Sequence, residues 1–191
     1  MKQEEMPQTG IVETERLILM ALTPELYDYM FANWSDAEIM AYMGNKDRAD
    51  FELEKEKYTK GLKSFHYTYK MFLMVEKETG RKIGRIGFHT WKQAHERAEI
   101  GYALHYEADK RKGYMTEAMK AVLIHGFEEM KLNRVEAFAS PLNTPSIRLI
   151  EKYGFTKEGL LRQHYGRNGV AEDSAVYGLL ASEYEVVKHK W

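Results

Sequence analysis

Hydrophobic and polar residues along this chain follow two different periods, which predict strands and helices in turn. A spacing of two marks a strand, whose successive side chains point to opposite faces, and spacings of three and four mark one face of a helix. The clearest helical pattern runs from Gly113 to Met130, where apolar side chains such as Ala118, Val122 and Phe127 lie largely opposite charged ones. One face of this helix is therefore expected to pack on a sheet.

Strands and further helices are predicted on both sides of this segment. The strand patterns are Arg16 to Ala21, Tyr67 to Glu76, Lys82 to Trp91, Ala98 to Tyr106, Arg134 to Ser140, Phe155 to Tyr165 and Ala171 to Leu180. Helices are expected from Thr23-Pro24 to about Phe31, after Ser35-Asp36, from Asp50 to Leu62 and from Thr144 to Tyr153. Short turn-rich connections favour antiparallel neighbours. The pattern thus predicts an α/β (α+β) fold in which helices pack on a mixed sheet.

The composition fits one globular domain without a strongly charged partner. Of 191 residues, 44% are hydrophobic and 30% are charged, and 28 Lys and Arg nearly balance 29 Asp and Glu. This balance gives no global electrostatic reason to expect binding to nucleic acid or to a membrane. We expect residues 11–191 to form a single domain that follows a flexible N-terminus of residues 1–10.

The absence of cysteine and the polar start of the chain bear on its compartment. Without cysteine there is no disulfide framework and no thiol nucleophile, which is compatible with a reducing cytoplasm. The opening residues, MKQEEMPQTG, lack the apolar core of a signal peptide. A cytoplasmic location is therefore expected.

A basic stretch with one glycine, KRKGYMTEAM, lies at the start of the best-defined helix. The first N–H groups of a helix have no intrahelical acceptor, and the helix dipole is positive there. Three consecutive cations, Lys110 to Lys112, add charge, and Gly113 lets an anion approach the backbone without a Cβ in the way. The stretch predicts a phosphate or pyrophosphate site; the alternative is a solvated basic loop.

Motifs for several other chemistries are absent from the sequence. It contains no Walker A ending, no Gly-x-Ser-x-Gly elbow, no His-Glu-x-x-His and no calcium-binding loop. The seven histidines are scattered, so each is expected to be structural or exposed rather than a metal ligand. The common nucleotide-fold, serine hydrolase and zinc protease interpretations are thereby removed.

The strand around Glu99 has two unlike faces. Ile100, Tyr102 and Leu104 alternate with Glu99, Gly101 and Ala103, which leaves one face small and polar. A carboxylate bordered by glycine and alanine has room for a substrate or a water molecule beside it. An ordinary solvent-facing strand would have the same pattern, so both interpretations stay open on the residues alone.

A second stretch, Asn143 to Phe155 (NTPSIRLIEKYGF), changes the interpretation of the basic loop. Read together, the two stretches resemble the GNAT superfamily of acetyl-CoA-dependent acetyltransferases, in its RimJ/RimL-like branch. The resemblance extends over nearly the whole chain, through Thr14 to Leu19, Gly84 to Gly87, Ala98 to Tyr102, Lys157 to Arg162 and Asp173 to Leu180. It implies the GNAT fold, a mixed and mostly antiparallel seven-stranded sheet that splays between its fourth and fifth strands, with about four helices packed on it.

The resemblance places the acetyl donor, acetyl-CoA, along the fourth strand and the basic loop. The family's pyrophosphate loop falls on Lys110 to Met115, where Lys110 replaces the usual Arg or Gln and Met115 replaces a small residue. The pantetheine arm would lie between the splayed strands, against the backbone of the fourth. The implied cofactor-binding residues are Ala103, Leu104, His105, Lys110, Arg111, Lys112, Gly113, Tyr114, Met115, Thr116, Asn143 and Ser146. The implied reaction uses no metal.

Glu99 and Ser146 are the implied catalytic residues. With the family match, Glu99 becomes the first choice for general base, acting directly or through water. The tyrosine that many GNAT members use as general acid falls at Ile150, so it is missing; Ser146 is the best substitute and Tyr153 a weaker one. For Ser146 the alternative is a helix-start serine bonded to the backbone, and Asn143 could likewise be only an N-cap.

The resemblance implies direct transfer of acetyl to an amine in a ternary complex, most of all to the N-terminal α-amine of a protein such as a ribosomal protein. The alternatives are an acetyltransferase for a small amine (an antibiotic, polyamine or amino acid) and a non-catalytic acyl-CoA-binding module. A homodimer or higher homo-oligomer is compatible with the sequence. The determinants of the acceptor are expected between about Ser35 and Leu62 and in the loop from His164 to Val170.

Overall fold

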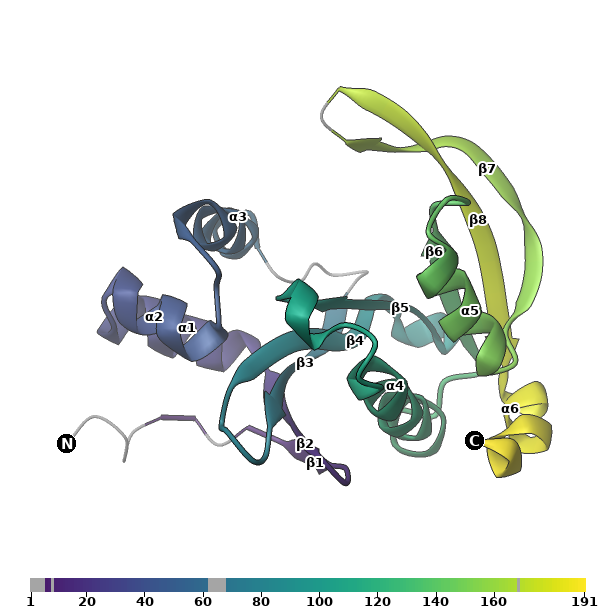
Figure 1. Ribbon diagram of the computed structural model, residues 1–191, viewed down its shortest axis with the longest axis horizontal. Helices are drawn as coiled ribbons and strands as arrows, with labels where there is room; N and C mark the ends of the chain where they lie inside the picture. Colours follow the sequence, from purple (N-terminus) through teal and green to yellow (C-terminus); the bar gives the residue numbers. More distant parts are fainter. Residues whose placement is uncertain (1–5, 8, 62–67, 168) are drawn as a thin grey trace.

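A computed structural model describes residues 6–7, 9–61, 68–167 and 169–191. It contains one mixed sheet with helices on both faces (Figure 1). The strands are β1 (Ile11–Glu13), β2 (Leu17–Leu22), β3 (Thr68–Glu76), β4 (Lys82–Lys92), β5 (Arg97–Leu104), β6 (Arg134–Ala139), β7 (Thr156–Arg167) and β8 (Val170–Leu180). The α-helices are α1 (Pro24–Asn33), α2 (Asp36–Met43), α3 (Arg48–Thr59), α4 (Tyr114–Ile124), α5 (Thr144–Lys152) and α6 (Ala181–Val187). The predicted ends at Leu62 and Tyr67 lie outside the described residues.

The predicted α/β fold class is confirmed, while the expected numbers of strands and helices were too low. The sheet has eight strands rather than seven because the short strand β1 pairs with β2 at the edge of the sheet. Three residues are too few to show a periodic pattern. The described part of the chain has six α-helices, and one of them, α6, is only seven residues long. The long helix predicted to Met130 ends as an α-helix at Ile124 and continues as a π-helical turn, His125–Glu129.

The starts of the first two helices follow from local hydrogen bonds. Thr23 caps α1 by accepting the N–H of Leu26 at 3.2 Å, and Pro24 occupies the first helical turn, where a missing N–H costs nothing. Ser35 and Glu38 form a reciprocal capping box at α2. Both helix starts predicted from Thr23-Pro24 and Ser35-Asp36 are therefore confirmed.

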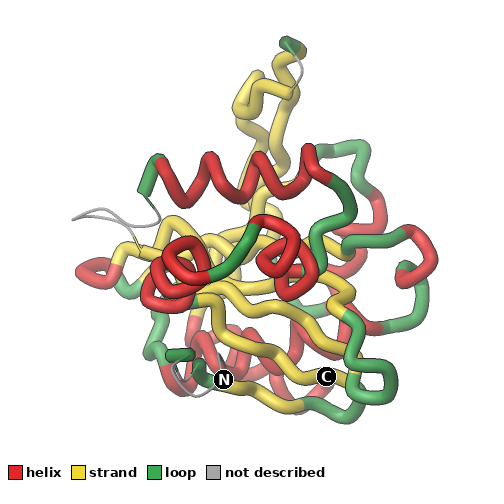
Figure 2. Tube along the Cα trace, turned by 90° about the vertical axis from the view of Figure 1, so that its left-hand side faces the viewer, coloured by secondary structure: helices red, strands yellow, loops and turns green. Residues whose placement is uncertain are grey.

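The strand order β1-β2-β3-β4-β5-β6-β8-β7 places one parallel pair inside an otherwise antiparallel sheet. That pair is β5 with β6, and the crossover between them carries α4. The hairpin of β7 and β8 projects past the helices (Figure 2). The one parallel pair is thus the place where the sheet changes its connectivity.

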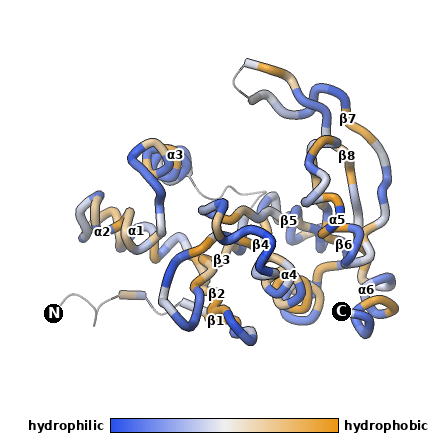
Figure 3. Tube along the Cα trace, viewed as in Figure 1, coloured by the Kyte–Doolittle hydropathy of each residue, from blue (hydrophilic) through white to orange (hydrophobic). Residues whose placement is uncertain are grey.

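Two apolar clusters cover the two faces of the sheet. The larger one joins α4, the π-helical turn and α5 to one face, through residues such as Leu19, Phe72, Ile86, Met119 and Val122. The second one joins α1, α2 and α3 to the other face of β2 and β3, through Leu26, Met30, Phe51 and Leu73. The strand β2 is strongly apolar, whereas α3 is largely polar (Figure 3). No helix within the described ranges is long and apolar enough to cross a membrane.

Candidate active site

Among the described residues, no strand pairs with the β6-facing edge of β5 beyond Glu99. The parallel pairing with β6 covers only Arg97 to Glu99 on the β5 side, although β5 runs on to Leu104. Over the same length β5 stays paired with β4, and β6 stays paired with β8. The two strands therefore separate after three paired residues. The splay predicted between the fourth and fifth strands occurs here between β5 and β6, because β1 shifts the numbering by one.

The register decides which backbone groups of β5 face the opening. The N–H of His105 donates to the carbonyl of Ile83 at 2.9 Å, so His105 faces β4. Hydrogen-bonding direction alternates along an antiparallel strand, so the backbone of Ala103 also faces β4. The backbone groups of Tyr102 and Leu104 face the opening. Of the three residues expected to hold the pantetheine arm, Leu104 thus presents its backbone to the opening, together with Tyr102, which was not expected.

The basic loop enters α4 with exposed cations and free helix donors. Lys110, Arg111 and Lys112 are all exposed, and Arg111 has a left-handed backbone with φ 61°. Gly113 is the N-cap, with φ 81° and no side-chain cap, so no side chain of its own blocks the helix start. The backbone N–H groups of the first turn belong to the predicted residues Tyr114, Met115 and Thr116. This geometry is suited to an anion such as pyrophosphate.

Arg16, just before β2, contacts the basic loop and the first turn of α4 through its side chain. Its guanidinium donates to the carbonyl of Lys112 at 3.0 Å and to the carboxylate of Glu117 at 2.7 Å. The central carbon of the guanidinium lies 4.8 Å from the centre of the Tyr114 ring, in a cation–π contact. A Cβ built on Gly113 would lie 3.3 Å from this guanidinium. The shape of the loop is therefore fixed by a residue about a hundred positions earlier in the chain.

The start of α5 brings Ser146 to the opposite side of the opening. Asn143 is the N-cap, as the alternative interpretation proposed: its side-chain oxygen accepts the N–H of Ser146 at 3.2 Å. The hydroxyl of Ser146 lies 2.7 Å from the hydroxyl of Tyr102 on β5. Burial raises the pKa of Tyr102 above its usual value, and the hydrogen bond to Ser146 opposes that rise. Ser146 and Tyr102 thus form a hydroxyl pair across the opening.

Tyr153 and His105, the other two candidates, lie in other surroundings than the hydroxyl pair. Tyr153 is buried, and its hydroxyl donates to the backbone carbonyl of Thr116 at 2.5 Å, so it fixes α5 to α4. The ring of His105 lies toward α2, where a Cβ on Gly44 would come within 3.5 Å of it. Burial lowers the pKa of His105. Within the described residues, neither side chain forms a hydrogen bond with Tyr102 or Ser146.

Glu99 lies on the face of β5 opposite to Tyr102. Arg85 pairs in register with Ala103 and bonds the buried Glu54 of α3, so the odd-numbered residues of β5 face α3. Burial raises the pKa of Glu99 to about 7, opposed by the hydroxyl of Tyr165, which donates to Glu99 at 3.4 Å. A carboxyl with this pKa can exchange a proton near neutral pH.

Two strand irregularities turn side chains toward Glu99. The pairing of β4 with β5 shifts between His89 and Lys92, and Thr90 there has φ 50°, which is rare for a β-branched residue. The pairing of β7 with β8 shifts between Leu161 and Tyr165, and Gln163 within it has φ 52°. Bulges of this kind re-aim side chains next to active sites. Sequence analysis did not identify His89, Thr90 or Tyr165. No local pattern marks the cross-strand register that pairs His89 with Glu99, or either of the two bulges.

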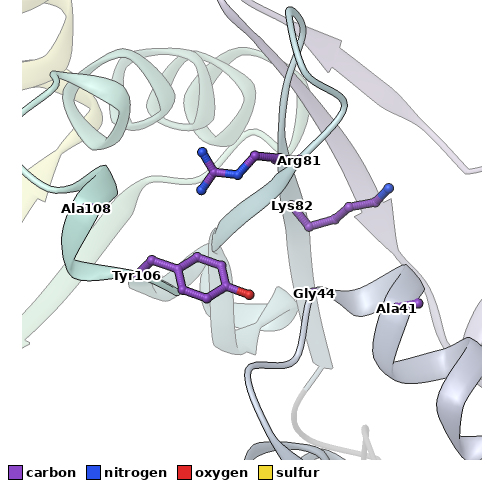
Figure 4. Close-up of a pocket in the computed structure, with 6 residues that line it drawn as sticks. All are labelled: Ala41, Gly44, Arg81, Lys82, Tyr106 and Ala108. Carbon is purple, nitrogen blue, oxygen red and sulfur yellow. The ribbon is translucent and has the colours of Figure 1, made fainter.

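A separate open pocket of about 530 Å³ lies between α2 and the end of β5 (Figure 4). It is lined by Ala41, Gly44, Arg81, Lys82, Tyr106 and Ala108. Arg81 is held by the fully buried Asp109 at 2.8 Å, which offsets its charge. None of the predicted site residues lines this pocket. Within the described ranges no three His, Asp or Glu side chains are grouped as a metal site requires.

Comparison with known proteins identifies the chain's relatives. Residues 16–156 match the model of the acetyltransferase (GNAT) domain family. The chain is 36% identical over 176 residues to "Uncharacterized N-acetyltransferase p20" of Bacillus licheniformis, covering 90% of this chain and 96% of the relative. It is 37% identical over 106 residues to "Putative ribosomal N-acetyltransferase YdaF" of Bacillus subtilis, covering 56% and 57%. A GCN5-related N-acetyltransferase from Brucella melitensis has a similar structure, with a TM-score of 0.70 at 28% identity over 96% of this chain and 84% of that one.

Proposed function

The chain belongs to the GNAT family of acetyltransferases, and from this premise we propose that it transfers acetyl directly to the N-terminal α-amine of a protein. The RimJ/RimL-like resemblance of the sequence supports this acceptor, and so does the similarity to YdaF, which carries a ribosomal N-acetyltransferase name. The single observation on which the proposal depends is the secluded carboxyl of Glu99, which lies next to the open edge of β5.

The residues at the opening fit the shape and charge of acetyl-CoA. The unpaired backbone of Tyr102 and Leu104 offers hydrogen bonds to the amides of a pantetheine arm, as a neighbouring strand would. The start of α4, with Gly113 and three exposed cations, offers backbone N–H groups and charge to a pyrophosphate. Acetyl-CoA supplies the acetyl group as a thioester; the protein supplies the orientation and the proton transfers.

Glu99 acts as the general base in this proposal. Its pKa of about 7 lies close to that of an α-amine, which is about 8. Taking a proton from an α-ammonium group would be uphill by about 1 pKa unit, or about 1.4 kcal/mol. For a lysine or another alkyl amine of pKa about 10.4 the same transfer would be uphill by about 4 to 5 kcal/mol. The base is therefore better matched to an α-amine than to a side-chain amine or a polyamine.

The hydroxyl pair acts at the other side of the reacting atoms. A departing thiolate with a pKa of about 8.5 needs little help but benefits from one hydrogen-bond donor. Ser146 Oγ can donate a hydrogen bond to the thiolate while it accepts one from the hydroxyl of Tyr102, 2.7 Å away. Burial raises the pKa of Tyr102, so its phenol stays protonated at neutral pH.

An unbiased acceptor screen tests the proposal. Purified protein is incubated with acetyl-CoA and a set of peptides whose first residue varies, alongside spermidine, free lysine and an aminoglycoside, and products are identified by mass spectrometry. We expect acetylation at the peptide α-amine. N-formylated copies of the same peptides, which retain their lysines, serve as matched controls and should stay unmodified. Modification of the small amines alone would replace the proposal with its small-molecule alternative, and no product with any amine would favour the acyl-CoA-binding module.

A further inference from the structure

His89 of β4 lies between Glu99 and the solvent. Its Nε2 atom is 3.6 Å from the Oε1 atom of Glu99. The Glu99 side chain is only 13% exposed, whereas that of His89 is 40% exposed. A base that is closed off in this way gains a proton in every reaction cycle and must release it before the next one. His89 is an exposed titratable group beside it.

Thr90 fixes which nitrogen of His89 carries the proton. The hydroxyl oxygen of Thr90 lies 3.1 Å from Nδ1 of His89, and the same hydroxyl lowers the pKa of Glu99, as a donor to its carboxylate does. A hydroxyl has a single proton to donate. When that proton is directed at Glu99, the contact with His89 is made by an N–H at Nδ1. The Nε2 atom, which faces Glu99, is then left with a free lone pair. It is an acceptor directed at the base.

The backbone next to the contact between His89 and Glu99 adopts an unfavourable conformation at Thr90 and leaves space for the ring at Gly101. Thr90 is a β-branched residue held at φ 50°, an unfavourable conformation that persists only where other contacts enforce it. Opposite the ring, a Cβ on Gly101 would lie 2.7 Å from Nε2 and 2.8 Å from Cδ2. Only glycine leaves room for the imidazole at this place.

We propose that His89 is the proton relay of Glu99, an inference that rests on the proposed function. After Glu99 has taken the proton of the acceptor amine, its O–H bond breaks as a new N–H bond forms at Nε2 of His89. This leaves a carboxylate and an imidazolium, and the imidazolium then releases the same proton to water. Thr90 retains the proton on Nδ1 throughout. His89 acts through Glu99 and is a positioning and relay residue rather than a catalytic one.

Burial and the ammonium of Lys57 favour the neutral ring of His89 between cycles. Burial lowers the pKa of His89, and the ammonium of Lys57 on α3 lowers it further. From the sheet, Glu99 and Glu136 face the same region, and Tyr165 reaches Glu99 from β7. A neutral ring has its Nε2 lone pair free, so the relay is ready whenever Glu99 becomes protonated.

Kinetics with an added base test the relay. With acetyl-CoA and a serine-initiated peptide in dilute buffer, we expect His89→Gln to lower kcat by about 10-fold or more while the KM of acetyl-CoA stays unchanged. Free imidazole in the medium should restore much of the lost kcat, since it can collect the proton instead. His95→Gln replaces an exposed histidine in the loop after β4 and should behave as wild type with and without imidazole. Glu99→Gln should not respond to imidazole. A His89→Gln enzyme with normal kcat, or one whose loss imidazole does not restore, would overturn the relay.

The tautomer provides a readout that needs no acceptor. Nitrogen-15 NMR of the imidazole should show His89 protonated at Nδ1 and unprotonated at Nε2 at neutral pH, and Thr90→Val should remove this preference. A proton on Nε2 in the wild-type protein would overturn the relay even in an active enzyme. If no peptide is acetylated while the tautomer is as expected, the proposed function is wrong, but the arrangement of His89, Thr90 and Glu99 is supported.

Discussion

Replacing Glu99 with glutamine should make the protein more stable and nearly inactive at the same time. The carboxyl is largely buried, and this burial raises its pKa from 4.5 to about 7. The folded state therefore binds a proton more tightly than the unfolded state does. Stability from this group is fully present below about pH 4.5 and falls as the pH rises toward about 7, because ionisation is easier in the unfolded chain.

The size of the effect follows from the shift in pKa. At about 1.4 kcal/mol per unit, a rise from 4.5 to about 7 costs the wild type about 3 kcal/mol of stability at about pH 8 and less than about 1 kcal/mol at about pH 5. Glutamine removes the charge and keeps the size, and its oxygen can still accept from Tyr165 and Thr90. We expect Glu99→Gln to be more stable by about 2 kcal/mol at about pH 8 and by under about 1 kcal/mol at about pH 5.

Urea unfolding of both proteins at the two pH values measures this difference. Glu78→Gln, a change at an exposed glutamate in the β3–β4 turn, is the matched control and should show no such pH dependence. In parallel, kcat of Glu99→Gln should fall by on the order of 10²-fold near neutral pH and recover as the pH rises. Equal stability gains at both pH values, or no gain at all, would refute the buried, high-pKa carboxyl. An unchanged kcat would remove Glu99 from the proposed mechanism.

Three further changes test the other parts of the site. Gly113→Val should weaken acetyl-CoA binding at least 10-fold in calorimetric titration, since it adds a Cβ at a φ of 81°, whereas Lys112→Ala should weaken it only modestly; equal affinities would contradict backbone capture of the pyrophosphate. Ser146→Ala should lower kcat by about 10- to 100-fold with little change in KM, as measured by thiol release, and an unaffected rate would reassign Ser146 to the helix start alone. Glu54→Ala should destabilise the fold by about 3 to 5 kcal/mol in urea unfolding because it leaves the guanidinium of Arg85 buried without its partner; a loss below about 1 kcal/mol would show that water solvates Arg85.

The sequence by itself determined the elements and their ends wherever the controlling contacts are local. Thr23 and Ser35 cap helices through N–H groups three residues ahead, and Asn143 does the same for α5. Gly113 marks the left-handed entry into α4. These contacts span one helical turn, so a short stretch of sequence contains both partners. The family motif added the position of the opening, which the register of β5 and β6 then located.

Only the tertiary structure decided how the site is assembled around those elements. Tyr102 and Ser146 are 44 residues apart in the sequence, and Tyr165 and Glu99 are 66 apart. The antiparallel register of β4 and β5 places His89 directly opposite Glu99, and the bulge that follows contains Thr90. Which side chains meet across such separations depends on strand register and on bulges, and a shift by one residue would turn each of them to the opposite face. The pKa of Glu99 has the same origin, since it reflects the burial that those distant segments create, and no property of the residues next to Glu99 in the sequence determines it.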